Sequence, residues 1–382
     1  MSNAKFMLDL VDTGNNTLLP NIDFDSMSYS RAFASIGSAT IEIPARYNAS
    51  QFERDSLFRL YRTVPGSGPV LEAGGVWFTR TKTVDLQTGN ISLKCVDQND
   101  LLRRRLVGYR QTTILADHTD IDGGSDYADD LMKAYVKENM GEDTQIPPLP
   151  GGLDTDRDMR PFLTVESDKT LGPDVEEAAA FKKVIDTLSS IKGKAKELGT
   201  EVFWDVSARN DGSFDFRTHI GSLGVQRQSF VNGIVFSPEA GNLTKASLTW
   251  DWSEEITFVY LGAGSNDGES RIVTVEGDNV DATPWNRIET YVGAAELTDS
   301  ALTDIGNGVI EGALPKIKIN ALTVDTASTV YGLHYFYGDS VYVQAGGYLF
   351  ECHINSIKNK IANGTDNPTV SLVGELPLVQ IT

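Results

Sequence analysis

At 382 residues, with 40% hydrophobic and 23% charged residues, the chain has the composition of a globular protein and a length that suits two or three domains. Its net charge of −20 at pH 7 argues against specific binding to nucleic acid, because clustered cations recognise the phosphate backbone. No apolar run reaches the roughly 18 residues that span a bilayer, and the N-terminal segment lacks the apolar core of a signal peptide. We therefore expect folding in a cytosol and no stable membrane association.

Residues 1–105 are predicted to form a first β-barrel-like domain or a small sandwich. Alternating or continuous apolar runs predict strands at 5–12, 28–35, 38–44, 76–86 and 90–96, and Gly89-Asn90 predicts a turn between the last two. The segment holds 12 basic and 11 acidic residues, a net charge of +1. Its single basic cluster, Arg103 to Arg105, is interpreted as a solvated strand end or a subunit contact.

Residues 106–228 are predicted to form an α/β insertion domain. A helix is expected at 125–141, with Ser125 or Asp126 as N-cap, and an exposed loop rich in Pro, Gly and Asp at 144–161. An Asp211-Gly212 turn predicts a hairpin. A second helix is expected at 173–199, with one apolar stripe formed by Phe181, Val184, Ile185, Leu188, Ile191, Ala195 and Leu198.

Residues 229–382 are predicted to be β again, as a second β-barrel-like domain with C-terminal strands. Strands are expected at 248–252, 256–261, 348–357 and 369–376, and within 329–343. The run ITFVYL is apolar on both faces, so we expect it to be covered twice, by the core and by another subunit or domain. The predicted fold class is mainly β with an α/β insertion, with domains at 1–105, 106–228 and 229–382.

The segment YLGAGSNDGESR contains three glycines that invite comparison with a phosphate-binding loop. Gly262, Gly264 and Gly268 give the spacing GxGxxxG, whereas a dinucleotide site needs GxGxxG between a strand and a helix. A strand-like run, RIVTVEG, follows, and Asp267 and Glu269 would repel a phosphate. The segment is interpreted as a hairpin connection, and no cofactor is expected.

Two acidic clusters are candidate sites. In HTDIDGGSDYAD, Asp120, Asp122, Gly123 and Asp129 occupy usable positions of a calcium loop, but His118 stands at the first position and the final Glu is missing. An acidic turn leading into a helix is favoured there, with calcium kept as the alternative. Asp251, Glu254 and Glu255 could form a glycosidase pair, but a polar turn between strands is favoured.

Cysteine and histidine offer little further chemistry. Cys95 and Cys352 lie far apart without CxxC spacing and are expected to be reduced, buried thiols. The four histidines show no zinc motif, so no metal site and no catalytic residue is predicted.

An ordered set of segments resembles the tail-hub proteins of long-tailed bacteriophages, the baseplate-hub or tail-tip family. The matching segments are VDQNDLLRRRL (96–106), DYADDLMKAYVKENMG (126–141), FKKVIDTLSSI with GTEVFWDV, the stretch 235–271, WNRIETYVGAAEL (285–297) and YFYGDSVYV (335–343). The resemblance implies a homotrimer in which each chain gives two small β-barrel-like domains to a ring that matches the sixfold tail. It implies a structural protein of the virion tail tip.

The resemblance also implies partners and residue roles. The partners would be a distal tail protein or tail tube ring, the tape-measure C-terminus, and distal fibre or receptor-binding proteins. Gly262, Gly264 and Arg271 would shape a hairpin, Trp285 and Glu289 fall in the matching segment 285–297, and Gly338-Asp339 would start a barrel strand. The chain stops at Thr382, so we expect no C-terminal hydrolase or receptor-binding extension.

Two alternatives remain open from the sequence. A hub that also degrades peptidoglycan would use Asp251, Glu254 and Glu255. A carbohydrate-binding module would need exposed aromatic side chains such as Trp204 or Trp285.

Overall fold

The protein is described from a computed structural model. The structure describes residues 4–12, 16–107, 126–141, 148–149, 152–153, 162–179, 181–221, 223–224, 227, 233–263, 271–277, 285, 287–294, 298–314, 316–362, 365–366, 368–375 and 377–380. Within these ranges no helix is both long and apolar enough to cross a membrane.

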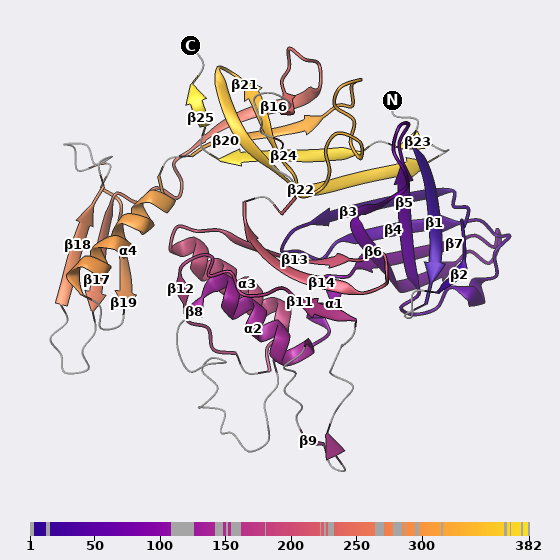
Figure 1. The fold of residues 1–382 in the computed structure, drawn as a ribbon, viewed down its shortest axis with the longest axis horizontal. Helices are drawn as coiled ribbons and strands as arrows, with labels where there is room; N and C mark the ends of the chain where they lie inside the picture. Colours follow the sequence, from indigo (N-terminus) through magenta and orange to yellow (C-terminus); the bar gives the residue numbers. More distant parts are fainter. Residues whose placement is uncertain are drawn as a thin grey trace.

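Strands from the two ends of the chain join in one large sheet (Figure 1), with the order β16-β20-β24-β22-β3-β4-β7-β6-β5-β1-β2. Pairing is antiparallel along this order, and β15 adds a parallel pair with β21. The N-terminal elements are β1 (Lys5–Val11), β2 (Thr17–Leu19), β3 (Ser26–Ala32), β4 (Ser38–Ile43), η1 (Ala49–Gln51), β5 (Leu57–Thr63), β6 (Val70–Val84) and β7 (Ile91–Asp97). The C-terminal elements are β15 (Val235–Phe236), β16 (Leu243–Asp251), β20 (Lys316–Thr323), β21 (Ser340–Ala345), β22 (Tyr348–Ala362), β23 (Thr365–Asp366), β24 (Thr369–Glu375) and β25 (Pro377–Gln380).

The pairing of β22 with β3 joins the two ends of the chain. Seven consecutive residue pairs align there, from Ser356 opposite Ala32 to Ala362 opposite Ser26. In β3 every second side chain is buried, namely Met27, Tyr29 and Arg31, because successive residues of a strand face opposite sides of the sheet. A single hydrophobic cluster draws residues from both ends of the chain, including the buried thiols Cys95 and Cys352.

The middle of the chain forms a separate α/β layer below this sheet in Figure 1. Its three-stranded sheet has the order β11-β14-β13, and β13 and β14 form the predicted hairpin, with Gly212 at a φ of 94° in the turn. The elements are α1 (Asp100–Arg103), β8 (Asp126–Tyr127), α2 (Ala128–Met140), β9 (Pro148–Leu149), β10 (Gly152–Leu153), β11 (Leu163–Val165), β12 (Asp174–Val175), α3 (Val184–Glu197), β13 (Val202–Ala208) and β14 (Phe214–Ile220). The predicted helix at 125–141 is present as α2, but it begins only at Ala128. The prediction of Asp126 as N-cap is wrong, because Asp126 lies in β8 and Tyr127 holds the N-cap position without a side-chain cap bond; Ser125 lies outside the described residues.

The prediction of a helix over 173–199 is wrong for residues 173–183. Helix α3 begins only at Val184, since the preceding backbone is engaged elsewhere. β12 pairs with β8, and the N–H of Phe181 donates to the carbonyl of Val107 at 3.2 Å. Phe181 has a φ of 52° and is 62% exposed, so it is not part of the stripe. Leu188, Ile191 and the other buried stripe residues of α3 do pack in the insertion core.

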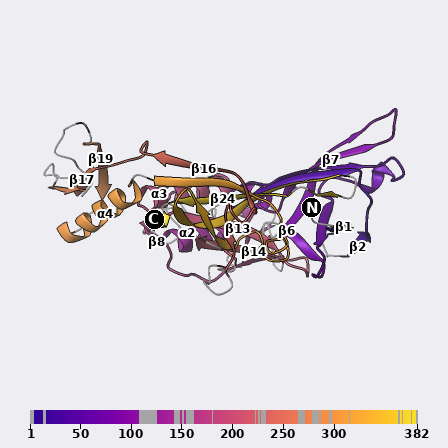
Figure 2. The same cartoon turned by 90° about the horizontal axis from the view of Figure 1, so that it is seen from above.

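A small unit projects from the end of the large sheet (Figures 1 and 2), and we call residues 258–312 the satellite unit. It contains β17 (Phe258–Ala263), β18 (Arg271–Glu276), β19 (Glu289–Ala294) and α4 (Asp299–Gly312), with the strand order β18-β17-β19. Helix α4 has no counterpart among the elements predicted from the sequence. Its signals were present: Thr298 caps the helix by accepting from the N–H of Ala301, and Leu302, Val309 and Ile310 form its buried face.

Three glycines bring the satellite unit against the insertion. Gly199 follows α3 at a φ of 87°, and a Cβ built on Gly312 of α4 would lie 2.5 Å from the Cα of Gly199. A Cβ on Gly199 would lie 2.6 Å from the carbonyl oxygen of Gly308. The backbones therefore touch directly, which only glycine permits.

Candidate functional site

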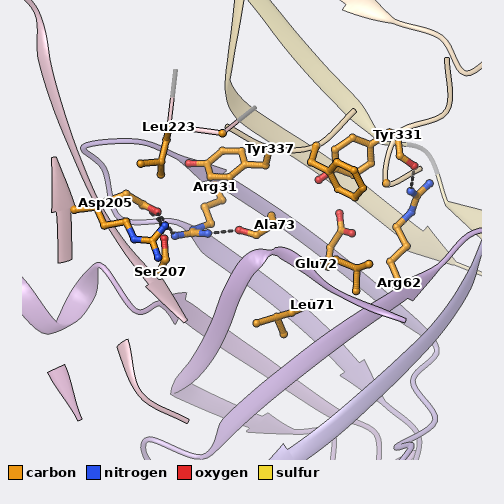
Figure 3. A pocket seen from close by; sticks show the side chains of 15 residues that line it. Arg31, Arg62, Leu71, Glu72, Ala73, Asp205, Ser207, Leu223, Tyr331 and Tyr337 are labelled. Atoms are coloured by element: carbon orange, nitrogen blue, oxygen red, sulfur yellow. Dashed lines mark hydrogen bonds and ion pairs between the residues drawn. The ribbon is translucent and has the colours of Figure 1, made fainter. Parts of the chain in front are cut away.

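A cavity of about 310 Å³ lies where three parts of the chain meet (Figure 3). These are the first β segment (β1 to β7), the insertion (α1 to β14) and the C-terminal β segment (β15, β16 and β20 to β25). Its lining residues come from β3, β5 and β6, from β13 and β14, and from the segment before β21. Those most relevant to its chemistry are Arg31, Arg62, Glu72, Asp205, Tyr331 and Tyr337. Because three parts of the chain contribute, the cavity exists only when all three are docked.

Arg31 binds the first β segment to the insertion. Its Nε lies 3.2 Å from Asp97 Oδ2, and its Nη2 lies 2.8 Å from Asp205 Oδ2 and donates to the carbonyl of Val206 at 2.8 Å. Its Nη1 donates to the carbonyl of Ala73. The guanidinium group is thus held by partners from both the first β segment and the insertion. We call the region around the cavity, where the three parts of the chain meet, the junction.

The electrostatics of this cluster follow from burial. Burial opposes the charge of Arg31, but Asp205, Tyr337 and Asp97 outweigh it and raise the pKa of Arg31. Burial raises the pKa of Asp97 to about 6 and also raises the pKa of Asp205, although Arg31 opposes both shifts. Such a buried pair contributes little net energy but is costly to break on one side.

Arg62 makes the corresponding link between the two β segments. Its Nη2 lies 2.9 Å from Asp366 Oδ2, and its Nη1 donates to the carbonyl of Tyr331. Nearby, Glu72 is buried and accepts from the hydroxyl of Tyr29. Burial raises the pKa of Glu72, with Arg62 opposing the shift. The Tyr29 hydroxyl thereby provides a hydrogen bond to the buried carboxylate of Glu72, and Arg62 provides an ion-pair partner for Asp366.

The charged side chains at the junction serve to hold parts of the chain together. Arg31, Arg62 and Arg217 are each bound to a carboxylate, the last to Asp215 at 2.9 Å. Over the described residues there is no group of three or more His, Cys, Asp or Glu side chains placed to hold a metal. Sequence reasoning missed this cluster. Its signal was a charged residue at a strand position that alternation assigns to the interior, as with Arg31 in β3.

Of the predicted structural residues, four cluster in the satellite unit. Gly262 lies in β17, Arg271 begins β18 opposite Ala263, and Glu289 begins β19, where its carboxylate binds Arg287 at 2.6 Å. Trp285 is 91% exposed. Gly264 lies outside the described residues.

Gly338 and Asp339 lie far from that unit, directly before β21. Gly338 has a φ of 97° and donates its N–H to the carbonyl of Ile354 at 2.9 Å. The buried carboxylate of Asp339 accepts from the N–H of Phe336 at 2.9 Å and pairs with Arg227. The pair thus lies at the entry to a strand.

The glycosidase candidates lie at and just after the end of β16. Asp251 ends β16, and Glu254, whose side chain is 62% exposed, lies in the following turn, 4.0 Å from Lys196. The N–H of Glu255 donates to the carbonyl of Trp252. A polar turn thus follows β16 at Glu254, as favoured by the sequence, while Asp251 is the last strand residue.

The remaining candidates from the sequence are the calcium-loop residues and the sugar-binding ring Trp204. Of the calcium candidates, His118, Asp120, Asp122 and Gly123 lie outside the described residues, while the buried Asp129 binds Lys133 at 2.6 Å. Trp204 is fully buried, so the expectation that it could serve as an exposed sugar-binding ring is wrong.

Comparison with known proteins gives the family. A model of the Siphovirus ReqiPepy6 Gp37-like protein family matches residues 11–372. The chain belongs to this family. Among curated proteins, nothing matches the chain.

Solved structures show that members of this fold include phage tail proteins. The prophage MuSo2 43 kDa tail protein from Shewanella oneidensis shares 12% identity at a TM-score of 0.51, with 97% of this chain and 98% of that chain covered. A tail protein from Neisseria meningitidis MC58 shares 12% identity at 0.53, with 98% and 96% covered. The prophage tail protein gp18 from Listeria monocytogenes EGD-e shares 10% identity at 0.50, with 99% and 95% covered. The family member described here therefore has a phage tail-protein fold, mainly β, as the sequence predicted.

Proposed function

We propose that the protein is a structural tail-tip hub of a siphovirus and has no enzymatic activity. In this proposal it forms a homotrimeric ring between the sixfold tail tube or distal tail ring and the distal tip or fibre proteins, with the tape-measure C-terminus as a further partner. The domains are those set out from the sequence, 1–105, 106–228 and 229–382. The virion tail tip is the proposed location.

The observation that carries the proposal is the arrangement of two β segments in one sheet. Pairing of β3 with β22 places the two segments side by side within a single chain, so three chains would present six β units to the tail. In the described part of the chain, β16 and β2 end the strand order, and an open strand edge is a site for pairing with another chain. Trp250 on β16 is 47% exposed.

Mass photometry of the purified chain, alone and with its neighbouring tail proteins, tests the assembly. Three copies of the 41.6-kDa chain are expected. Trp250→Glu is expected to shift the population toward monomers, because it places a charge at the proposed contact. Trp285→Glu, a matched change in the satellite unit, is expected to leave the trimer intact. A stable state of any other copy number contradicts the ring.

The charge distribution supports a channel through which DNA passes without binding. Residues 229–382 hold 7 basic and 19 acidic residues, a net charge of −12 per copy. Carboxylates on a channel wall would repel phosphates over about 8 Å in physiological salt. We propose an acidic lumen, which a structure of the assembled tip tests: an uncharged or basic lumen contradicts it. A turbidity assay on cell walls tests the lack of enzymatic activity.

A further inference from the structure

In the satellite sheet α4 covers one face, and none of the described helices covers the other, which we call the open face. Val259 and Leu261 of β17 point to the helix and are fully buried. Residues of the opposite parity, Phe258, Tyr260 and Gly262, lie on the other face, since side chains alternate along a strand. Phe258 is buried beneath Arg287 and Gly262 beneath Tyr291, while Tyr260 is half-buried. The strand register places Ile272 of β18 beside Gly262, and Tyr291 of β19 beside Tyr260.

Tyr291 lies across two glycines on this open face. A Cβ built on Gly262 would lie 2.1 Å from the Tyr291 hydroxyl oxygen and within 2.9 Å of two ring atoms, and one on Gly293 would lie 3.8 Å from the ring. Gly262 and Gly293 are neighbours across β17 and β19. Glycine inside a strand weakens it, so two adjacent glycines under one ring need a reason. Their effect is that Tyr291, 64% exposed, lies along the sheet surface.

We call the part of the open face around Tyr291 and Tyr260 the platform. Polar side chains that bind one another border it. Arg287 lies over the ring of Phe258 at 3.7 Å from its centroid, and its Nε binds Glu289 Oε1 at 2.6 Å. The hydroxyl of Tyr260 donates to the same Glu289 oxygen at 3.2 Å and accepts from Arg287 Nη2 at 3.2 Å. These contacts fix the Tyr260 ring, which the strand register places beside Tyr291, and they put a hydrogen-bonded ion pair at the edge of the face.

We propose that this open face, centred on Tyr291, is a binding site for a neutral glycan chain. The face of an aromatic ring carries negative potential, which complements the positive C–H face of a sugar ring. The Arg287–Glu289 pair and the Tyr260 hydroxyl supply hydrogen-bonding groups beside this face. The opposite charges of Arg287 and Glu289 offset each other and Glu276 adds a negative charge to the face, so the face suits a neutral chain better than an anionic one. The site lies outside the junction and does not depend on the proposed ring.

Single-stranded nucleic acid is the other ligand that stacks on aromatic platforms. It also requires a cationic track along its backbone. Here the guanidinium of Arg287 is bound to Glu289, and Glu276 on β18 occupies the same face opposite Phe258. The local charge therefore favours sugar over nucleic acid.

Isothermal titration of the full chain with chitohexaose, together with affinity electrophoresis in dextran and in laminarin, tests the proposal. We expect binding to at least one of these neutral probes. Tyr291→Ala should weaken that binding by about tenfold, whereas Tyr291→Phe should retain it, because the ring face is kept. Trp252→Ala removes a 58% exposed aromatic from outside the platform and should change nothing.

A matched pair of glycine substitutions tests the flat placement of the ring. Gly262→Ala drives a methyl group into Tyr291 and should weaken binding, while Gly293→Ala, with its nearest ring atom 3.8 Å away, should not. Melting temperatures of all variants confirm that they are folded. The proposal is overturned if no neutral probe binds, if binding survives Tyr291→Ala in a folded protein, or if oligothymidine binds with equal affinity.

Discussion

His219 is a buried, neutral histidine whose replacement should stabilise the protein and alter its response to acid. The side chain is 5% exposed, and the ring packs between Phe33 at 4.7 Å and Phe203 at 5.5 Å. Among the residues that the structure describes, neither ring nitrogen has a hydrogen-bond partner. Burial lowers its pKa from 6.5 to about 3, and Lys169, His353 and Lys192 act in the same direction.

The sign and size of the effect follow from proton linkage. Between pH 6.5 and 3 the unfolded chain binds a proton at His219 that the folded chain does not, so stability falls as the pH falls through this window. At pH 5 the loss relative to neutral pH is about 2 kcal/mol. His219→Phe removes this loss and the unpartnered nitrogens, which cost about 1–3 kcal/mol when buried.

Urea unfolding at pH 7 and pH 5, followed by tryptophan fluorescence, measures both contributions. His219→Phe should be the more stable protein at pH 7 and should exceed the wild type by about 2 kcal/mol more at pH 5. His219→Gln keeps a buried polar group but cannot titrate, so it should gain only the pH-dependent part. The reasoning is refuted if wild type and His219→Gln lose the same stability between pH 7 and pH 5.

Three further predictions concern the insertion, its contact with the satellite unit, and ligands. Leu188 is fully buried in α3, so Leu188→Ala should lower the free energy of unfolding by about 2–5 kcal/mol in urea titrations, and a loss below 1 kcal/mol contradicts its core role. Gly312→Ala should lower the melting temperature because its Cβ would lie 2.5 Å from the Cα of Gly199, whereas Gly308→Ala, with its nearest atom at 3.7 Å, should not; equal melting temperatures refute the close contact. ATP, NAD and calcium should each leave the melting temperature unchanged, and a concentration-dependent rise with any of them shows a site.

Local sequence patterns predicted the strands and turns whose structure depends mainly on residues close to one another in the sequence. Alternation located β1, β4 and β7, and the β13–β14 hairpin followed from Asp211-Gly212. The helix prediction failed for the Ala-rich segment before α3, because the backbone there makes hydrogen bonds to residues around Val107. Helix propensity is a local property and does not reveal such long-range pairing.

The junction could not be predicted for a related reason. Arg31, Asp97 and Asp205 are far apart in sequence and meet only through tertiary packing. Each one alone looks like an ordinary charged residue in a strand. Only the docking of the insertion on the first β segment turns them into a buried cluster.

The pairing of β22 with β3 has a consequence for how the chain is made. Until residues 348–362 leave the ribosome, β3 has no neighbour on one side, although β4 to β7 are long since available. Translation at about 5–20 residues per second leaves that strand edge open for many seconds while the insertion and satellite unit are synthesised. An open edge readily pairs with other chains, so a message cut short before β22 should yield an aggregating fragment that could also trap complete chains.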